Sequence, residues 1–343
     1  MPTIEPFDFV PYPSGNAIDY TKATGHDHFQ GCSGRLECEL EALSPFLVMD
    51  SELRDGSSQN SAVQFKKNRS GTYVVPGTSL KGLVRSVFEV LYPSCTRISG
   101  GKTKVPSAFR PCRSHHKVCP ACRVFGFLNG GTVLKGKVNI GTAHAVGTPE
   151  LGTDRQLIGL FRPHPEEAKY NRNGHAKGYK FYFHQQEVKT ANQDNDKKFG
   201  TWITPLKPGT CFTFSVTFEN LTDRELNALV AALVLTDRAT DPETGDTVAV
   251  RHKLGYGKPA GLGSVAIRLT DVELQSNARK AYTSFDRSPR VLQEGSSELK
   301  KWIAKRQQLV FGDPSRAVQH LTRILRYPPR EDVTYAYDKG AFG

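Results

Sequence analysis

Two segments of the chain alternate apolar and polar residues with a period of two, which is typical of half-buried strands. In residues 36–43, LECELEAL, apolar positions alternate with Glu37, Glu39 and Glu41. In residues 210–220, TCFTFSVTFEN, phenylalanine and valine alternate with threonine and serine. Further strands are predicted in 136–146, 179–184 and 264–269.

Helical periodicity separates these strands. Residues 76–93 place apolar side chains three and four positions apart, with a threonine–serine pair as the expected cap. Residues 221–235 repeat the pattern, and Thr222 and Glu225 have the spacing of a capping box. Two amphipathic helices are therefore expected between strands.

The order of elements is strand, helix, strand and again strand, helix, strand, which predicts a ferredoxin-like, RRM-like α+β core. Helices on one face of such a sheet leave the other face free, and RNA-recognition modules bind RNA there. We expect an N-terminal extension at 1–33, the core at 34–270 and a mostly helical C-terminal extension at 271–343. The core carries insertions at about 95–125 and about 147–208.

The charge balance favours a polyanionic partner. Lysine and arginine number 46 against 34 aspartates and glutamates, a formal net charge of +12. Each phosphate that a cation neutralises releases condensed counterions, so nucleic acid is the expected partner; the alternative is a soluble basic surface. Neither a transmembrane segment nor a signal peptide is recognisable, so we expect a cytoplasmic location and no membrane partner. The seven cysteines are then expected as reduced thiols or metal ligands.

Residues 112–122, CRSHHKVCPAC, have the composition of a metal site. Cysteine and histidine at this spacing can close a tetrahedron around Zn²⁺, and nothing demands an open catalytic position, so we expect a structural zinc. The expected ligands are Cys112, His115 or His116, Cys119 and Cys122. Cys95 is a reserve ligand, whereas Cys38 and Cys211 are expected in packing positions. The alternative is a set of unliganded thiols.

Two groups of cations are candidates for phosphate contacts. In the first predicted helix, Lys81 and Arg85 lie four residues apart on one face, close to N-terminal N–H groups that attract anions. In the segment 162–182 cations are interleaved with aromatic residues, a composition that suits single-stranded nucleic acid. The candidates there are Arg162, Lys169, Arg172, Lys177, Lys180 and Tyr182. The alternative for both groups is a solvated basic surface.

Residues 254–269, LGYGKPAGLGSVAIRL, place four glycines before a strand. The segment lacks the GxxxxGK[ST] pattern of a phosphate-binding loop, because Pro259 follows Lys258 and a strand, not a helix, comes next. We therefore expect no ATP site. The glycines instead allow an RNA backbone to approach closely. The residues expected at RNA are Lys253, Gly257, Lys258 and Gly261.

Three of these segments resemble motifs of the RAMP superfamily, the repeat-associated proteins of CRISPR effector complexes. VVPGTSLKGLVRS resembles the start of the family's first helix, CPACRVFG its cysteine knuckle and HKLGYGKPAGLGSV its glycine-rich loop. The resemblance spans about residues 25–270 and is greatest to a type III-D-like branch, which is related to single-chain fused type III effectors.

The resemblance implies a backbone subunit that binds guide RNA, repeats as copies of itself in a filament and positions complementary target RNA. Other effector subunits, and in some relatives a separate nuclease, are the implied protein partners. Residues 147–208 would then form a thumb-like insertion that crosses between guide and target. The zinc insertion would follow the first helix.

The resemblance leaves catalysis open. Active relatives cleave target RNA with an aspartate in the loop after the first strand and a divalent cation such as Mg²⁺. The 49–70 loop offers Asp50 and Asp55. The alternatives are a metal-dependent endoribonuclease acting through one of them and a subunit without nuclease activity. A third hypothesis, guide processing, would need acid–base residues such as His26, His28 or His144.

Overall fold

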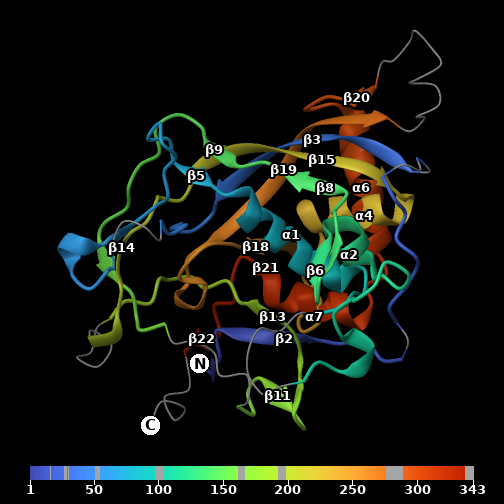
Figure 1. Ribbon diagram of the computed structural model, residues 1–343. Coiled ribbons are helices and arrows are strands. Elements are labelled where there is room, and N and C mark those ends of the chain that lie inside the picture. Colours follow the sequence, from blue (N-terminus) through green and yellow to red (C-terminus); the bar gives the residue numbers. More distant parts are fainter. Residues whose placement is uncertain are drawn as a thin grey trace.

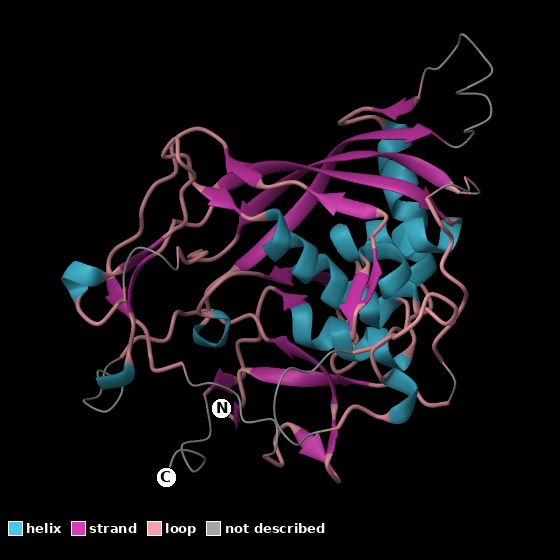
Figure 2. Ribbon diagram, in the orientation of Figure 1, coloured by secondary structure: helices cyan, strands magenta, loops and turns pink. Residues whose placement is uncertain are grey.

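A computed structural model describes residues 1–336 apart from positions 16, 27, 28 and 30 and the segments 51–54, 97–103, 161–166, 192–197 and 276–288. It confirms a mixed α and β protein with several sheets and few helices (Figures 1 and 2).

One large antiparallel sheet organises the chain. Its long strands are β3 (Cys32–Ala42), β15 (Cys211–Leu221) and β19 (Ser264–Gln275), with β3 between the other two. The strand order is β18–β19–β3–β15–β9–β5, with β8 also paired to β15 and β20 to β19. The shorter strands are β5 (Val74–Val75), β8 (Val138–Ile140), β9 (Ala143–Ala145), β18 (His252–Lys253) and β20 (Arg290–Leu292). The strand predicted at 136–146 is thus divided into two.

The helices cover one face of this sheet, the lower face in the view of Figure 1. The helix α1 packs on α4, and these two contact α7 and α6 respectively. Their bounds are α1 (Gly77–Leu91), α4 (Asp223–Leu233), α6 (Ser297–Phe311) and α7 (Arg316–Leu325). A short helix, α2 (Pro120–Phe125), contacts α1 and β8.

The N-termini of α4 and α1 can be compared with the caps predicted for them. The capping box of α4 is confirmed: the Thr222 hydroxyl accepts the Glu225 N–H, and the Glu225 carboxylate accepts the Thr222 N–H. The cap predicted for α1 is wrong, because Thr78 and Ser79 already lie in its first turn and Pro76 occupies the N-cap position without a side-chain hydrogen bond.

A smaller sheet lies beyond the helices. The strand β2 (Phe7–Pro11) pairs antiparallel with β13 (Gly178–Tyr182), and α7 packs on both. Residues from the predicted N-terminal extension and from the 147–208 insertion are therefore parts of one packed body. The remaining strands are β1 (Thr3–Ile4), β4 (Val63–Gln64), β6 (Phe127–Asn129), β7 (Thr132–Leu134), β10 (Arg155–Gln156), β11 (Asn171–Arg172), β12 (His175–Ala176), β14 (Trp202–Thr204), β16 (Ala239–Thr240), β17 (Thr247–Val250), β21 (Arg326–Tyr327) and β22 (Thr334–Tyr335).

The core between sheet and helices follows from strand register. Leu40 of β3 lies opposite Phe212 of β15 on one side and Ile267 of β19 on the other, and all three are buried. Phe212 also meets two buried aromatic rings, with centroids 5.9 Å away at Phe46 and 5.6 Å away at Phe65. These contacts fix the central strands against the layer below.

We expect Phe212→Ala to lower the free energy of unfolding by about 3–5 kcal/mol, because the missing ring leaves a cavity among well-packed neighbours. The neighbouring Thr213 is exposed on the same strand. Thr213→Ala should therefore change stability by no more than about 0.5 kcal/mol. Urea unfolding of both variants checks this, and equal losses would contradict the core assignment.

Candidate nucleic-acid interface and metal centre

Three segments that are distant in sequence meet at one cavity of about 500 Å³. The first turns of α1 contribute Ser79 and Gly82, β13 contributes Lys180 and Tyr182, and the segment 252–258 contributes Lys253 and Lys258. Among the described residues, none of those that line the cavity is acidic. The lysines of the cavity thus come from the aromatic-rich strand and the glycine loop, whereas α1 contributes no cation to the lining.

Aromatic faces surround one of these lysines. The ammonium nitrogen of Lys180 lies 3.7 Å from the ring centroid of Phe7 and 4.9 Å from that of Tyr182. The ammonium nitrogen of Lys258 is 5.7 Å from the Tyr182 centroid. Burial lowers the pKa of Lys180 to about 8 and also lowers that of Lys258. Ring faces stabilise the cations only in part, and a phosphate at the cavity would do so further.

Lys253 is buried beneath the cavity. Its ammonium donates to the Leu262 carbonyl at 2.8 Å and lies 3.4 Å from the Ser264 hydroxyl. Burial, together with the charge of Lys258, lowers the pKa of Lys253 to about 7. Beside it, Nδ1 of the buried His252 has no hydrogen-bond partner among the described residues. The floor of the cavity is therefore polar, and its charge is poorly compensated.

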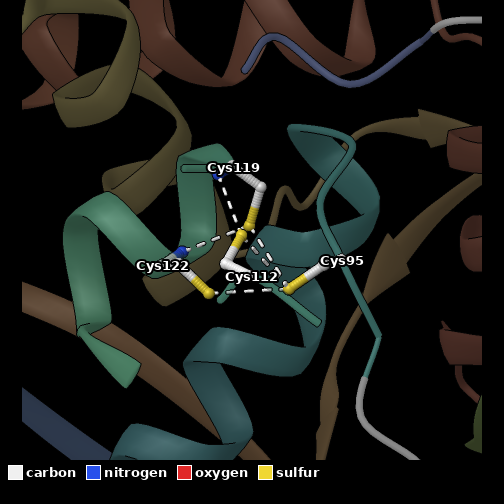
Figure 3. Close-up of side chains that lie close together, drawn as sticks. All are labelled: Cys95, Cys112, Cys119 and Cys122. Carbon is white, nitrogen blue, oxygen red and sulfur yellow. Dashed lines mark hydrogen bonds between the residues drawn. The ribbon is translucent and has the colours of Figure 1, made fainter. Parts of the chain in front are cut away.

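The cysteine insertion forms a separate site (Figure 3). Four buried cysteines, Cys95, Cys112, Cys119 and Cys122, place their sulfur atoms within 4.8 Å of one another. Individual distances from the sulfur of Cys95 are 3.5 Å to Cys119, 3.5 Å to Cys122 and 4.0 Å to Cys112. A tetrahedral Zn²⁺ with bonds of about 2.3 Å separates its sulfur ligands by about 3.8 Å. The cluster therefore can hold a metal ion such as zinc.

Local folding prepares two of these thiols, Cys112 and Cys119, to carry negative charge. The backbone N–H of Cys119 donates to the sulfur of Cys112 at 3.3 Å, and that of Cys122 donates to the sulfur of Cys119 at 3.5 Å. Cys119 is the N-cap of α2, and Pro120 follows at its first position. Hydrogen bonding with Cys112 also lowers the pKa of Cys119. These contacts stabilise the thiolates of Cys112 and Cys119, the form that binds metal, whereas the pKa values of Cys95 and Cys122 are raised.

A comparison with models of protein families shows the family to which this chain belongs. The RAMP superfamily model matches residues 39–266, about two thirds of the chain. The chain belongs to the RAMP superfamily. The cavity's α1 and glycine-loop segments and the cysteine knuckle lie within the matched range.

Solved structures give two further likenesses to this RAMP chain. A chain of a Type IV-B CRISPR complex has 16% identity, covering 69% of this chain and 90% of that chain, with a TM-score of 0.38. A chain of a Csm3-Csm4 subcomplex in the type III-A CRISPR-Cas interference complex has 14% identity, covering 82% and 97%, with a TM-score of 0.35. The comparison with curated proteins gives no match. None of the described helices of this RAMP chain has the length and apolar character needed to cross a bilayer.

The fourth member of the cysteine cluster differs from the sequence prediction. The predicted Cys112, Cys119 and Cys122 are brought together, but with Cys95 instead of a histidine. His115 and His116 are exposed, and neither joins the cluster. Cys95 lies seventeen positions before Cys112 in the sequence. Because the predicted ligands lie within eleven residues of one another, the local pattern predicted Cys95 only as a reserve ligand. The histidine assignment is corrected on this geometry.

Arg85 has a different environment from the one predicted. Its guanidinium donates to the Glu89 carboxylate at 2.8 Å, to the Gly126 carbonyl at 2.9 Å and to the Cys122 sulfur at 3.5 Å. Because these three partners already bind the Arg85 guanidinium, this side chain is not proposed to contact RNA. Lys81 is half-buried, and burial lowers its pKa. It remains a prediction.

The glycine loop is shaped by its own protein backbone. Gly257 and Gly261 both have positive φ, at 70° and 97°. A Cβ on Gly261 would lie 2.5 Å from the Glu187 carbonyl oxygen, and one on Gly263 would collide with the Leu254 carbonyl oxygen. These glycines permit close packing within the chain, so the expectation that they admit an RNA backbone is replaced by a role in holding Lys258 at the cavity.

The other predicted cations lie around β13. The ammonium of Lys169 is 3.4 Å from the Glu167 carboxylate and 5.6 Å from the Tyr170 ring centroid. Arg172 and Lys177 are exposed at the β11–β12 hairpin. Arg162 lies outside the described residues.

The two candidate catalytic aspartates are not grouped with other ligands. Asp50 is buried, and its carboxylate is 3.1 Å from the ammonium of Lys66. Asp55 is exposed and accepts hydrogen bonds from the backbone and hydroxyl of Ser57 at 2.9 and 2.8 Å, which lower its pKa. Within the described ranges, neither joins a group of three or more potential metal ligands.

The free face of the main sheet carries acidic groups. Glu37, Glu39 and Glu41 of β3 alternate with the buried positions, and Glu219 and Glu273 are exposed on the flanking strands. Arg35 and Arg268 offset only part of this charge. Phosphates would be repelled here, so the cavity, and not the free face on which RNA-recognition modules bind RNA, is the candidate interface.

We expect Cys95→Ser to abolish stoichiometric zinc in the purified chain, because a closed tetrahedral site loses one of its four ligands. His115→Ala combined with His116→Ala should retain one zinc per chain. Cys211→Ser, outside the cluster, is the matched thiol control. Elemental analysis of the three proteins measures this, and zinc loss confined to the double histidine variant would contradict the four-cysteine assignment.

Proposed function

We propose that this RAMP chain binds guide RNA as a repeating backbone subunit of a CRISPR effector ribonucleoprotein complex and positions complementary target RNA. One observation carries the proposal. Three segments distant in sequence meet at one cavity, which holds three lysines and, among described lining residues, no carboxylate. A bound phosphodiester would supply the missing negative charge.

The cavity's side chains suit a nucleotide strand. Tyr182 and Tyr256 line it with the lysines, so unpaired bases and phosphates could both find partners. The buried Lys253 and the ring-covered Lys180 have lowered pKa values, and an anion nearby would favour their charged forms. The proposed RNA-binding set is Lys81, Lys169, Arg172, Lys177, Lys180, Tyr182, Lys253 and Lys258.

The sheet order supports a ferredoxin-like core. Strands in the order β19–β3–β15–β8/β9, all antiparallel, correspond to the fourth, first, third and second strands of the split βαβ arrangement. In the proposed complex, the partners are further copies of this chain in a filament, other effector subunits and a separate nuclease. The four cysteines would hold a structural Zn²⁺ that stabilises the insertion after α1.

Target cleavage by this chain is the weaker alternative. A metal-dependent endoribonuclease needs carboxylates that converge on Mg²⁺, whereas Asp50 is paired with Lys66 and Asp55 is held by Ser57. Mg²⁺-dependent cutting of a matched target by the wild-type chain, lost in Asp50→Ala or Asp55→Ala, would favour the enzyme over the binding subunit.

We expect Lys180→Glu combined with Lys258→Glu to weaken binding of single-stranded RNA at least about tenfold at physiological salt, regardless of sequence. Arg238→Glu combined with Lys300→Glu makes the same change in net charge at exposed positions away from the cavity. Fluorescence anisotropy with labelled RNA compares the pairs. Equal losses would show that only total charge matters and would sink the cavity assignment.

Binding should also depend on pH near neutrality. In the RNA-free protein, the pKa is about 8 for Lys180 and about 7 for Lys253, and phosphate would raise both, so RNA binding takes up protons. Affinity should therefore fall several-fold as pH rises from about 6.5 to 8.5. The charged groups that act on these lysines are Glu5, Lys169 and Lys258.

Lys180→Arg keeps a charge throughout this range, so its pH dependence should be shallower. Anisotropy titrations at several pH values and constant ionic strength measure both proteins. An affinity that does not change with pH in the wild type would refute the proton uptake.

A further inference from the structure

A second basic pocket lies beside the cysteine cluster. Its volume is about 510 Å³, which is within the range that holds a nucleotide-sized ligand. Arg110, Arg113 and Lys117 line it together with Tyr20 and Cys112. Among the described lining residues none is acidic, and neither arginine has a carboxylate partner in the described part of the chain.

The aromatic ring in this pocket is held in place. The Tyr20 hydroxyl donates to the Ala108 carbonyl at 3.0 Å, and the ammonium of Lys117 lies 5.0 Å from the ring centroid. A ring fixed at one end, with a cation beside it, provides a stacking surface next to a phosphate contact. This pairing of cations with an aromatic ring suits an unpaired base and its backbone better than an acidic peptide.

The cysteine cluster holds the pocket's walls together. Cys112, a member of the cluster, belongs to the pocket lining, and Arg113 follows it directly. On the other side, the backbones of Thr21 and Val118 exchange hydrogen bonds at 3.1 and 2.8 Å, and Ala23 donates to the His115 carbonyl at 2.8 Å. The segments that carry Tyr20 and Lys117 are thereby joined next to Cys119. Bound metal would fix their spacing.

This pocket differs from the cavity at the start of α1. The two share no lining residue. The cavity takes residues from α1 as far as Val87, from β13 and from the segment 252–258, whereas the pocket is lined by residues within 18–20 and 107–117 and by none from α1.

We infer that the pocket formed by Tyr20, Arg110, Arg113 and Lys117 is a second binding site for single-stranded RNA, formed fully only when the cysteine cluster holds metal. The class of ligand, single-stranded RNA, rests on the proposed function, whereas the location of this pocket does not. It also gives a role to the exposed loop 113–117, whose histidines the metal cluster does not use.

The first test is charge reversal. Arg110→Glu, Arg113→Glu and Lys117→Glu are combined in one chain, and Arg238→Glu, Lys300→Glu and Arg316→Glu form a control of identical composition at exposed positions. The probe is a labelled single-stranded RNA of about 16 nucleotides, the upper end of single-site sizes. We expect the pocket variant to bind at least about tenfold more weakly than the control. Its salt slope should fall by about 2, since each phosphate contact contributes about 0.7.

The second test locates the RNA in the unmodified chain. RNA containing 5-iodouridine is photo-crosslinked and the modified residues are mapped by mass spectrometry, with zinc content and thermal unfolding measured on every protein. We expect crosslinks at Tyr20 and at Tyr182. Chelation of the metal should remove the Tyr20 crosslink and leave that at Tyr182, whereas Lys180→Glu with Lys258→Glu should do the reverse.

These outcomes separate the two assignments. A crosslink at Tyr20 without one at Tyr182 would retain the second pocket and overturn the cavity at α1. Crosslinks only at Tyr182, or a triple variant that matches its control in affinity and salt slope, would overturn the second pocket. A Tyr20 crosslink that survives complete metal removal would overturn its dependence on the cluster.

Discussion

The pairing of β3 between β15 and β19 determines the arrangement of the rest of the chain. Leu40 faces Phe212 and Ile267, so the apolar positions of all three strands lie on the helix side. A shift of one residue would exchange Leu40 with Glu39 or Glu41 and bury carboxylates against α1 and α4. The register therefore also assigns the glutamates of β3 to the open face. Fold and charge distribution follow from the same alternation.

The charge of the molecule therefore differs from one face to another. Acidic side chains collect on the open face of the sheet, whereas the cavity at α1 and the pocket beside the cysteines have no described acidic lining residue. Burying Lys253 and Lys180 costs solvation energy, as their lowered pKa values indicate, and Glu5 offsets this only in part at Lys180. Such a cost is tolerable in a folded chain when a ligand supplies the counter-charge. The net charge alone would not distinguish these faces.

The strongly periodic elements could be predicted from the sequence, because their pattern is local. The alternation of β3 and β15 and the Thr222–Glu225 capping box are examples. The site was less predictable where partners come from distant segments. Cys95 joins the cluster only because the chain returns after α1, and Arg85 faces Cys122 and Gly126 in place of solvent. Spacing along a helix shows which residues share a face, but not what covers that face.

The contacts of Arg85 connect the metal centre to the cavity through one rigid element. Arg85 lies in the middle of α1, and its guanidinium reaches Cys122, while Ser79 and Gly82 in the first turns line the cavity. From α2, which carries Cys122, Arg123 donates to the buried carboxylate of Glu225 on α4 at 2.8 Å. Removing one partner from such a buried pair is costly, since the other charge stays desolvated. The cysteine insertion is therefore anchored to both central helices, and its metal would stabilise the position of α1, the helix that supplies the cavity wall.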